Sequence, residues 1–508
     1  MFENKVFLVT YGISPESGVT VATLNQSKMF TDANYNVSIT TFDYQPKYKS
    51  IFDDLKSMNR VYENVHHLNK YEYYSQKNNN SGEIDKSIYK NEIEIKGKSF
   101  FKEEKENETI LSYFEEGSLI KSHFYQKNEL VALEYYNKVF DLVKRVEFNE
   151  RQSVSRKIYY SEITKNIARE SYFSDNGFCF LTRYYNEIGE PGQVFLFDID
   201  STEVKKFSGN KAHDKFWLNE IAIRFKHQNK KPLFISNGQG SGPKIMGIDK
   251  KHAKRAYFVH NNHFESPFTT GSKVKNKYDY VFKRIDKLDA LIVLTEKQKK
   301  DIQEQYGKHN NIYVIPNAIT ISKHEQREKR DNNIIMVTRL EPQKNIQRAI
   351  AMFRLVVEKR PDAILNIFGK GKEEKKLQNK IDEYKLGNNV FLKGYSRDIK
   401  EEIKSSVLSL LTSNYEGLPL AAVESLENET PVVSYDFNYG ATDIIDHNET
   451  GFIVELDDEK IMADKILYLL DKKEVASNMG KFGRLKMIDK YSNEVVYQKW
   501  MNMLKELG

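Results

Sequence analysis

The chain has 508 residues, of which 39% are hydrophobic and 12% aromatic, so it has enough apolar material for more than one packed core. Its 78 Lys and Arg residues against 72 Asp and Glu residues leave a formal charge of only +6. This weak basic excess argues against a nucleic-acid-binding protein and is compatible with a phosphate-rich polymer as partner.

The single cysteine, Cys179, excludes an internal disulfide and a cysteine-based metal cluster. We therefore expect a reducing, cytoplasmic location. The sequence has no apolar run of about 20 residues, the length that a membrane-spanning helix needs. Any association with a membrane, for instance at its inner face, is expected to be peripheral.

The first residues alternate between strand and helix patterns. Val6–Thr10 is a continuous apolar run, typical of a strand that is buried on both faces of a parallel sheet. A loop that ends at Gly18, a helical stretch and a second strand pattern follow. This alternation is typical of α/β proteins, and residues 1–77 are predicted to form the first part of a Rossmann-like domain.

Residues 78–204 have a different character and are predicted to form a β-rich insertion. The apolar segments Phe178–Leu181 and Val194–Phe197 flank the turn-like Gly189–Gly192, which predicts a β-hairpin. Exposed aromatic strands of this kind usually need a partner surface, so we expect the insertion to serve assembly and polymer binding rather than chemistry.

The α/β pattern resumes over residues 205–320, which complete the first Rossmann-like domain. A second such domain is predicted over residues 321–490, and residues 491–508 form an amphipathic C-terminal helix. The expected fold is therefore α/β, with two Rossmann-like domains that face a cleft and an antiparallel β-rich insertion in the N-terminal domain.

Two basic residues follow a predicted strand of the second domain. Arg339 and Lys344 lie on the loop between the strand Ile334–Val337 and the next helix. Ligands bind at the carboxyl ends of strands in open parallel sheets. A guanidinium and an ammonium at that edge can hold a pyrophosphate and stabilise it as a leaving group, although a solvated basic loop is the simpler reading.

Two glutamates, Glu416 and Glu424, are separated by seven residues around the start of a predicted helix. Pro419 suits the first turn of that helix, and the backbone around Leu420 offers free N–H groups to a phosphate. Glu424 is expected to bind hydroxyls such as those of a ribose, and Glu416 to face a sugar ring. A pair of capping or surface glutamates is the alternative.

A metal site is not expected. His260 and His263 have a spacing that a metal could use, but no carboxylate or cysteine completes the set of ligands. Asp198 and Asp200 match a D-x-D pattern that can hold a divalent metal, yet they end a hairpin strand of the insertion. We therefore expect no metal and no cofactor.

The basic pair followed by the two glutamates closely resembles the retaining glycosyltransferases of family 4, which have the GT-B fold. The resemblance implies that Arg339 and Lys344 bind the donor diphosphate, that Glu416 contacts the donor sugar and that Glu424 contacts the ribose. Further landmarks of the family are Phe368–Gly371, Leu392–Tyr395 and Asn448–Phe452.

The same resemblance assigns three further positions. Tyr395 would line the nucleobase pocket, and Gly18 would let the backbone approach the donor, although many members have two adjacent glycines there. His260 is similar to the family's strand-end histidine, which contacts the donor sugar, with His263 as second choice.

The whole chain, insertion included, resembles one subgroup, the wall teichoic acid α-glycosyltransferases of Gram-positive bacteria. The segments that carry this resemblance are Phe7–Gly12, Asn237–Lys244 and Tyr439–Asp443. It implies transfer of glucose or N-acetylglucosamine, with retention, from a UDP-sugar to poly(glycerol-phosphate) or poly(ribitol-phosphate), as in a poly(glycerol-phosphate) α-glucosyltransferase. It also implies a homo-oligomer, commonly a trimer, assembled through the insertion.

Two alternatives stay open. Related enzymes with similar insertions glycosylate serine-rich adhesins, so a protein acceptor is one of them. The other is an inactive scaffold subunit, but such subunits usually lose the glutamate pair or the basic pair, and this chain has both.

Overall fold

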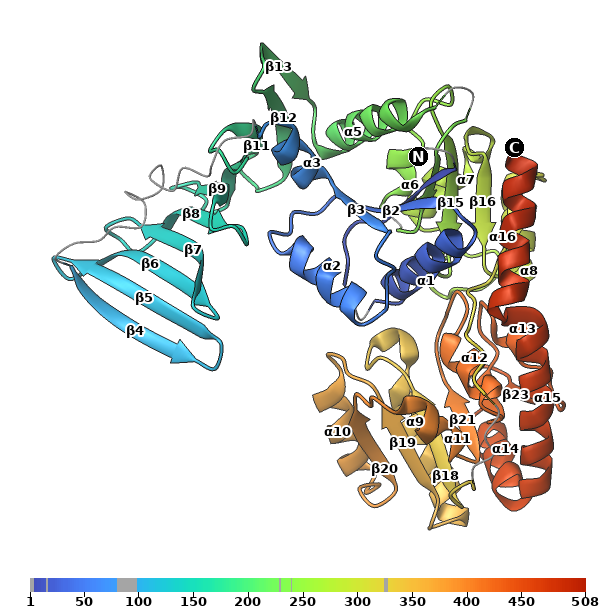
Figure 1. Ribbon diagram of the computed structural model, residues 1–508. Helices are drawn as coiled ribbons and strands as arrows, with labels where there is room; N and C mark the ends of the chain where they lie inside the picture. Colours follow the sequence, from blue (N-terminus) through green and yellow to red (C-terminus); the bar gives the residue numbers. More distant parts are fainter. Residues whose placement is uncertain (1–3, 15–16, 80–97, 228–229, 239, 324–327) are drawn as a thin grey trace. The chain divides into compact units, whose positions relative to one another are not determined.

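The computed structural model describes residues 4–14, 17–79, 98–227, 230–238, 240–323 and 328–508 (Figure 1). The chain divides into two compact units. The first comprises Met1–Ser236 and Gly240–Arg255, and the second comprises Asn237–Gln239 and Ala256–Gly508.

The first unit begins and ends with parallel α/β structure. Its strands are β1 (Lys5–Val9), β2 (Asn36–Thr41), β3 (His66–Asn69) and β14 (Leu233–Ser236), in the order β14-β1-β2-β3. Val6–Val9 is fully buried, as its apolar run predicts. The helices are α1 (Gly18–Asp32), α2 (Tyr48–Ser57), α3 (Lys70–Lys77), α5 (Asn210–Phe225) and α6 (Gly242–Ile245).

An antiparallel meander separates α3 from α5, which confirms the predicted β-rich insertion. It runs in chain order through β4 (Ser99–Lys105), β5 (Glu108–Glu115), β6 (Ser118–Gln126), β7 (Glu129–Tyr136), β8 (Leu142–Phe148), β9 (Val154–Tyr160), β10 (Ile167–Phe173), β11 (Cys179–Tyr185), β12 (Pro191–Asp198) and β13 (Ser201–Phe207). The predicted hairpin is β11–β12, in which Leu181 lies opposite Leu196.

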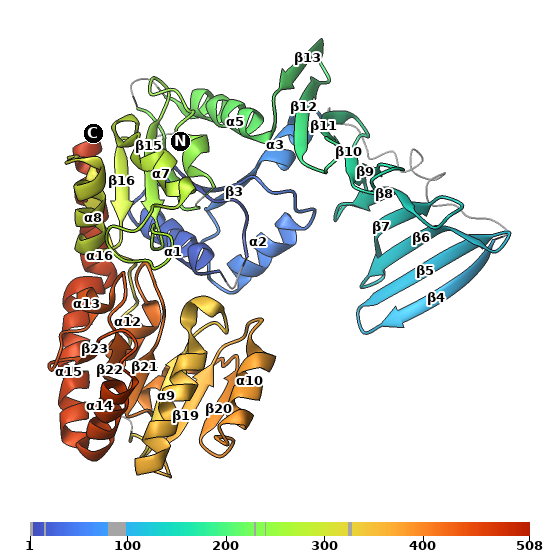
Figure 2. The ribbon, with the colours of Figure 1, turned by 180° about the vertical axis from the view of Figure 1, so that it is seen from behind.

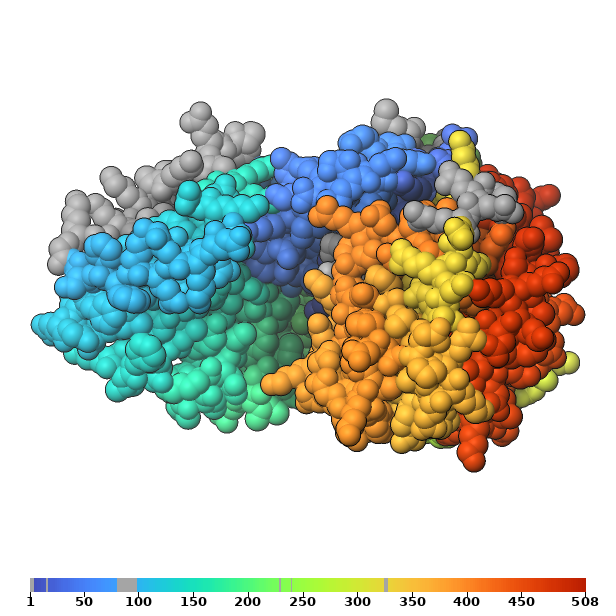
Figure 3. All heavy atoms as spheres, turned by 90° about the horizontal axis from the view of Figure 1, so that it is seen from below, coloured from blue at the N-terminus to red at the C-terminus, as the bar shows by residue number. Residues whose placement is uncertain are grey.

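Among the described residues, β4 and β13 are the edge strands of this meander. Every side chain of β4 is exposed, including Phe100 and Phe101, and β13 is nearly as exposed. Figures 1 and 2 show β4 as the outermost strand, and Figure 3 shows β4 and β5 at the surface of this unit. Unpaired strand edges with exposed aromatic residues can pair with another chain.

A buried polar network joins the insertion to helix α3. Arg183 on β11 forms an ion pair with Glu170 on β10 at 2.8 Å, and its second nitrogen donates to the hydroxyl of Tyr71 on α3 at 2.6 Å. The ring of Tyr172 packs on that of Tyr71. Because these polar groups satisfy one another away from water, they hold the insertion to α3 in one orientation.

The second unit contains two parallel groups of strands. The first group is β15 (Lys254–Val259), β16 (Ala290–Val293) and β17 (Ile312–Val314), with α7 (Asn276–Phe282), η2 (Ile285–Lys287) and α8 (Glu296–Tyr306) between them. The C-terminal helix α16 (Asn493–Leu507) packs here, because Trp500 contacts Phe258 and the Tyr313 hydroxyl donates to Glu506 at 2.9 Å.

The second group forms the C-terminal parallel sheet, in the order β20-β19-β18-β21-β22-β23. Its strands are β18 (Asn333–Val337), β19 (Ile364–Phe368), β20 (Val390–Gly394), β21 (Leu408–Leu411), β22 (Val432–Tyr435) and β23 (Gly451–Val454). Its helices are η3 (Pro342–Lys344), α9 (Ile346–Lys359), α10 (Glu374–Glu383), α11 (Ile399–Lys404), α12 (Leu420–Glu427), α13 (Ala441–Ile444), α14 (Glu459–Asp471) and α15 (Lys473–Tyr491).

The order of these strands reverses between β18 and β21, since β19 and β20 lie on one side and β22 and β23 on the other. Such a switch point at the carboxyl ends of parallel strands is where doubly wound sheets bind their ligands. Figure 1 shows the long helices α14 and α15 beside the β21–β23 half of the sheet. The fold thus places the loops after β18 and β21 next to each other.

Candidate functional site

The loops after β18 and β21 bring a lysine and a glutamate together. Lys344 Nζ lies 2.5 Å from Glu416 Oε1, although the two residues are 72 positions apart. Glu416 is only 7% exposed, and its carboxylate also accepts hydrogen bonds from Ser413 Oγ at 2.7 Å and Gln343 Nε2 at 3.2 Å. The Glu416 carboxylate is therefore held in one position by a cation and two neutral donors.

Gln343 and Ser413 were not singled out from the sequence. Gln343 also donates to the carbonyl of Tyr415 at 2.9 Å, so it fixes both the backbone and the side chain of the Glu416 loop. Their only signal in the sequence is position, because each lies within three residues of Lys344 or Glu416.

Arg339 lies at the end of β18 and is exposed. Its guanidinium makes no salt bridge with a carboxylate of any residue that the structure describes. Two glycines of the Phe368–Gly371 segment shape the loop that carries it. A Cβ on Gly369 would lie 1.8 Å from the carbonyl oxygen of Thr338, and one on Gly371 would lie 2.3 Å from that of Leu340. These glycines are therefore required for close packing, beyond the role in a turn that their sequence indicates.

Glu424 lies on α12 and is half-buried. Burial raises its pKa above the ordinary value, and the nearby Glu427 adds to this, while Lys400 opposes it. Among the described residues no side chain donates a hydrogen bond to this carboxylate. A half-buried acceptor without a side-chain donor can accept hydrogen bonds from the hydroxyl groups of a ligand.

Pro419 occupies the N-cap of α12 rather than its first turn, and Leu420 is the first helical residue. The N–H groups of Ala422 and Val423 donate back to the Pro419 carbonyl. The N–H groups of Leu420 and Ala421 lie before these hydrogen bonds, at the start of the helix. N–H groups in the first turn of a helix can bind an anion.

The strand-end histidines have different environments. His260 follows β15, is half-buried, and has Nε2 3.1 Å from Asn237 Oδ1. Burial lowers its pKa to about 3, so its imidazole is neutral at neutral pH. His263 is fully buried against Phe264 and Tyr439, with its pKa also lowered to about 3, chiefly by burial. His263 is therefore a core side chain, and His260 is the one with access to a ligand.

The His260 segment and the Glu416 loop touch within the second unit. A Cβ on Gly417 would lie 2.3 Å from the carbonyl oxygen of His260. The amide of Asn262, 0% exposed, donates to the Asn438 carbonyl at 2.9 Å, and the same carbonyl accepts the N–H of Glu416 at 3.0 Å. His260, Lys344 and Glu416 are thereby parts of one connected site.

Two further predicted site residues, Tyr395 and Gly18, do not lie on the loops after β18 and β21. Tyr395 follows β20 and is 75% exposed. Gly18 begins α1 in the first unit, where a Cβ would meet nothing within 4 Å. Its small size is therefore not required by packing against the described residues.

The D-x-D segment lies at the end of β12. Asp198 is paired with Lys77 on α3 at 2.8 Å. Among the described residues there is no group of three or more His, Cys, Asp or Glu side chains that could hold a metal. Over the same residues, no helix is long and apolar enough to cross a membrane.

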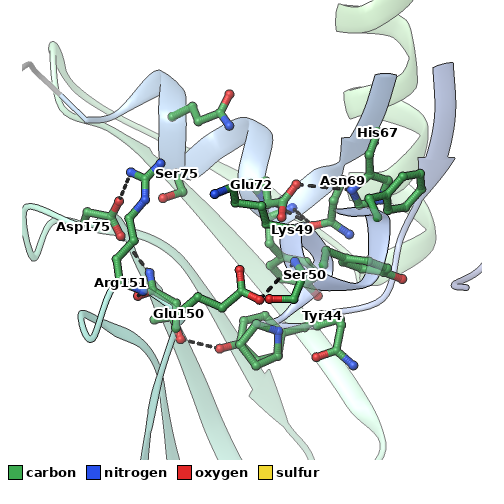
Figure 4. Close-up of a pocket in the computed structure, with 18 of the residues that line it drawn as sticks. Tyr44, Lys49, Ser50, His67, Asn69, Glu72, Ser75, Glu150, Arg151 and Asp175 are labelled. Atoms are coloured by element: carbon green, nitrogen blue, oxygen red, sulfur yellow. Dashed lines mark hydrogen bonds and ion pairs between the residues drawn. The ribbon is translucent and has the colours of Figure 1, made fainter. Parts of the chain in front are cut away.

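The first unit also holds a cavity of about 620 Å³ between α2, β3 and α3 and the turns of the insertion. Figure 4 shows Arg151 paired with Asp175 at one side of it and Glu72 beside His67 at another. Carboxylates outnumber cations in its lining. This balance suits hydroxyl-rich ligands and disfavours a second diphosphate site.

A family model matches part of the C-terminal half, and two relatives match nearly the whole chain. The family model "Glycosyl transferases group 1" matches residues 317–486. The chain is 30% identical to the poly(ribitol-phosphate) alpha-N-acetylglucosaminyltransferase of Staphylococcus aureus (strain COL), over 98% of this chain and 99% of that protein. It is 26% identical to the poly(glycerol-phosphate) alpha-glucosyltransferase of Bacillus subtilis (strain 168), over 96% of this chain and 73% of that one.

Solved structures agree over the whole length. A crystal structure of TarM superimposes with a TM-score of 0.88 at 27% identity and covers 99% of this chain and 98% of that one. A crystal structure of an S. aureus TarM mutant in complex with Fondaparinux, α-GlcNAc-glycerol and UDP gives a TM-score of 0.80 at 26% identity, over 98% of this chain and 99% of that one. The coverage includes the β-rich insertion as well as both Rossmann-like regions.

Proposed function

This chain belongs to the family of the teichoic acid α-glycosyltransferases, within the group 1 glycosyltransferases, and from that membership we propose its reaction. It transfers a hexose, glucose or N-acetylglucosamine, from a UDP-sugar to a hydroxyl of poly(glycerol-phosphate) or poly(ribitol-phosphate), with retention at the anomeric carbon. The observation that carries this proposal is the Lys344–Glu416 pair at the switch point of the C-terminal sheet.

The donor is proposed to bind along the carboxyl ends of β18 and β21. Arg339, exposed and without a salt bridge to a described carboxylate, and Lys344 would bind the diphosphate, together with the first N–H groups of α12. Glu424 would accept hydrogen bonds from the ribose hydroxyls, because its half-buried carboxylate has no side-chain donor among the described residues. Tyr395 would stack beside the base.

The chemical step needs charge stabilisation more than a strong base. The acceptor oxygen bonds to the anomeric carbon as the bond from that carbon to the diphosphate oxygen breaks, and the acceptor proton passes to the departing diphosphate. Arg339 and Lys344 would stabilise the negative charge that develops there. Glu416 would orient the sugar hydroxyls, and the neutral His260 would donate or accept a hydrogen bond without carrying charge.

Divalent metal is not required in this proposal. The cations that would neutralise the diphosphate are side chains, and Asp198 of the D-x-D segment already pairs with Lys77. Transfer that continues at full rate in EDTA would support this, and a strict need for Mg²⁺ or Mn²⁺ would contradict it.

The insertion is proposed to assemble the protein into a homo-oligomer, a trimer, and to engage the polymer. The exposed side chains of its edge strand β4, among them Phe100 and Phe101, motivate the assembly. Several active sites held near one chain raise the local acceptor concentration. We further propose that the protein acts in the cytoplasm, at the inner face of the membrane.

One experiment tests the function. The purified protein is supplied with UDP-glucose or UDP-N-acetylglucosamine, each with glycerol-phosphate or ribitol-phosphate polymer, and the α-linked product is identified by NMR. Transfer to at least one polymer is expected. Transfer only to a serine-rich protein would show that the acceptor is a protein and not a teichoic acid polymer. The absence of both transfer and UDP-sugar hydrolysis would favour an inactive scaffold.

A further inference from the structure

The loop between β15 and α7 carries a cation that the donor site does not use. This loop runs from His263 to Lys275 and closes on itself, because Lys275 N–H donates to the His263 carbonyl at 2.9 Å and Glu265 N–H to that of Lys273 at 2.7 Å. Lys275 Nζ donates to the backbone carbonyl of Asn262 at 2.9 Å. The loop therefore returns the ammonium to the end of β15, next to His260.

Two aromatic rings surround this ammonium. Lys275 Nζ lies 4.7 Å from the ring centre of Tyr415 and 5.4 Å from that of Phe268. The two rings pack on each other with centroids 4.0 Å apart. Because Tyr415 immediately precedes Glu416, the ammonium stands beside the segment that orients the donor sugar.

In the part of the chain that the structure describes, the ammonium lacks an anionic partner. No described carboxylate forms a salt bridge with Lys275, and the nearby Glu265 pairs instead with Lys273 at 3.2 Å. Burial lowers the pKa of Lys275, an effect that Glu265 only partly offsets. Cation–π contacts stabilise an ammonium only weakly and do not replace a counter-ion.

The position of Phe268 is itself built into the site. The Asn262 amide donates to the Phe268 carbonyl at 2.9 Å and also to the Asn438 carbonyl, which in turn accepts the N–H of Glu416. The aromatic pair and the ammonium are thus held by the same buried amide that holds the Glu416 backbone. A loop that served only as a connection would not need this attachment.

We propose that Lys275, on its platform of Phe268 and Tyr415, binds a phosphodiester of the acceptor beside the hydroxyl that receives the sugar. This inference rests on the proposed polyanionic acceptor. An ammonium has three N–H donors, and only one is bonded to Asn262 here, so two are available to phosphate oxygens. Arg339 and Lys344 already supply the charge for the donor diphosphate, which leaves the acceptor as the anion that Lys275 serves.

Three variants test this subsite. Lys275→Met keeps the aliphatic stem and removes the charge, Lys275→Arg keeps the charge, and Lys273→Met removes an exposed charge two residues away as a matched control. The KM for defined glycerol-phosphate oligomers, the kcat at saturating oligomer and the affinity for UDP are measured for each. Thermal unfolding confirms that each variant is folded.

The loss of a charge-assisted hydrogen bond predicts that Lys275→Met raises the KM for the oligomer about tenfold or more. The affinity for UDP should change by less than about twofold, and kcat should change much less than KM, since the donor contacts are untouched. Lys275→Arg should restore most of the loss. Higher ionic strength should raise the wild-type KM more than that of Lys275→Met.

Three outcomes overturn the subsite while the proposed function stands. An unchanged KM in Lys275→Met would do so, as would weaker UDP binding, which would place Lys275 in the donor site. An equal loss in kcat for every acceptor would make the lysine a support for Tyr415 and Glu416. Failure of the proposed function is distinguishable, because the wild-type protein itself would then transfer no hexose to the oligomer.

Discussion

Replacing Glu416 by glutamine removes one negative charge from a carboxylate that a lysine, a serine and a glutamine hold. The amide can still accept from Ser413 or Gln343, but the ammonium of Lys344 loses its partner at 2.5 Å. The side chains of Lys344 and Glu416 are 18% and 9% exposed, so water reaches the lysine in part. We expect the free energy of unfolding to fall by about 1–3 kcal/mol, less than for a fully buried pair.

Transfer should fall more than stability. If the carboxylate orients the donor sugar, Glu416→Gln should reduce kcat/KM by about 100-fold, which corresponds to about 2.7 kcal/mol of lost transition-state stabilisation. The assay is transfer of labelled hexose to glycerol-phosphate polymer, with chemical denaturation in parallel. Glu416→Ala should lose at least as much transfer.

A double-mutant cycle separates the two roles of Lys344. The unfolding free energies of Lys344→Met and Glu416→Gln should not add, with a coupling of about 0.5–3 kcal/mol, because each variant strands the other group. The affinity for UDP should fall with Lys344→Met in both the wild-type and the Glu416→Gln backgrounds, since the ammonium also binds the diphosphate. Near-normal transfer by Glu416→Gln, or an unchanged affinity for UDP in Lys344→Met, would refute this reasoning.

Three further predictions follow from burial and backbone packing. Glu424→Gln should weaken UDP-sugar binding yet raise the free energy of unfolding at neutral pH. The reason is that a carboxyl whose pKa is raised in the folded protein destabilises the fold as pH rises through that pKa. Thermal unfolding without ligand is the check, and equal or lower stability of the variant would contradict this. His260→Asn should reduce the loss of unfolding free energy between about pH 6.5 and 3. A histidine whose pKa is lowered to about 3 in the folded protein destabilises the fold as pH falls through that window. The check is the slope of unfolding free energy against pH. Gly369→Ala should weaken UDP binding by displacing the Arg339 loop, because its Cβ would lie 1.8 Å from a backbone oxygen and its φ is +142°. The assay is calorimetric titration with UDP. Gly387→Ala is the matched control, because a Cβ there meets nothing within 4 Å.

The local pattern of apolar residues and glycines was sufficient to predict several strands of the fold. The run Val6–Thr10 and the hairpin around Gly189–Gly192 are strands in the structure, because a continuous apolar run and a glycine turn between apolar runs have few other solutions. The change from α/β pattern to alternating strands likewise located the β-rich insertion. The resemblance to family 4 glycosyltransferases, and not the spacing alone, joined Arg339, Lys344, Glu416 and Glu424 into one predicted site.

Contacts between distant segments were decided by tertiary structure alone. No sequence pattern pairs Lys344 with Glu416, because their approach depends on β18 and β21 being neighbours in the sheet. The same holds for Gly417, where a side chain would meet the His260 carbonyl, and for the burial of His263, which leaves His260 as the more accessible of the two histidines. The sequence by itself determined which residue types are available at each strand end. Only the packed sheet decided which of them meet, since the distances over which charges and hydrogen bonds act are set by strand order and not by separation along the chain.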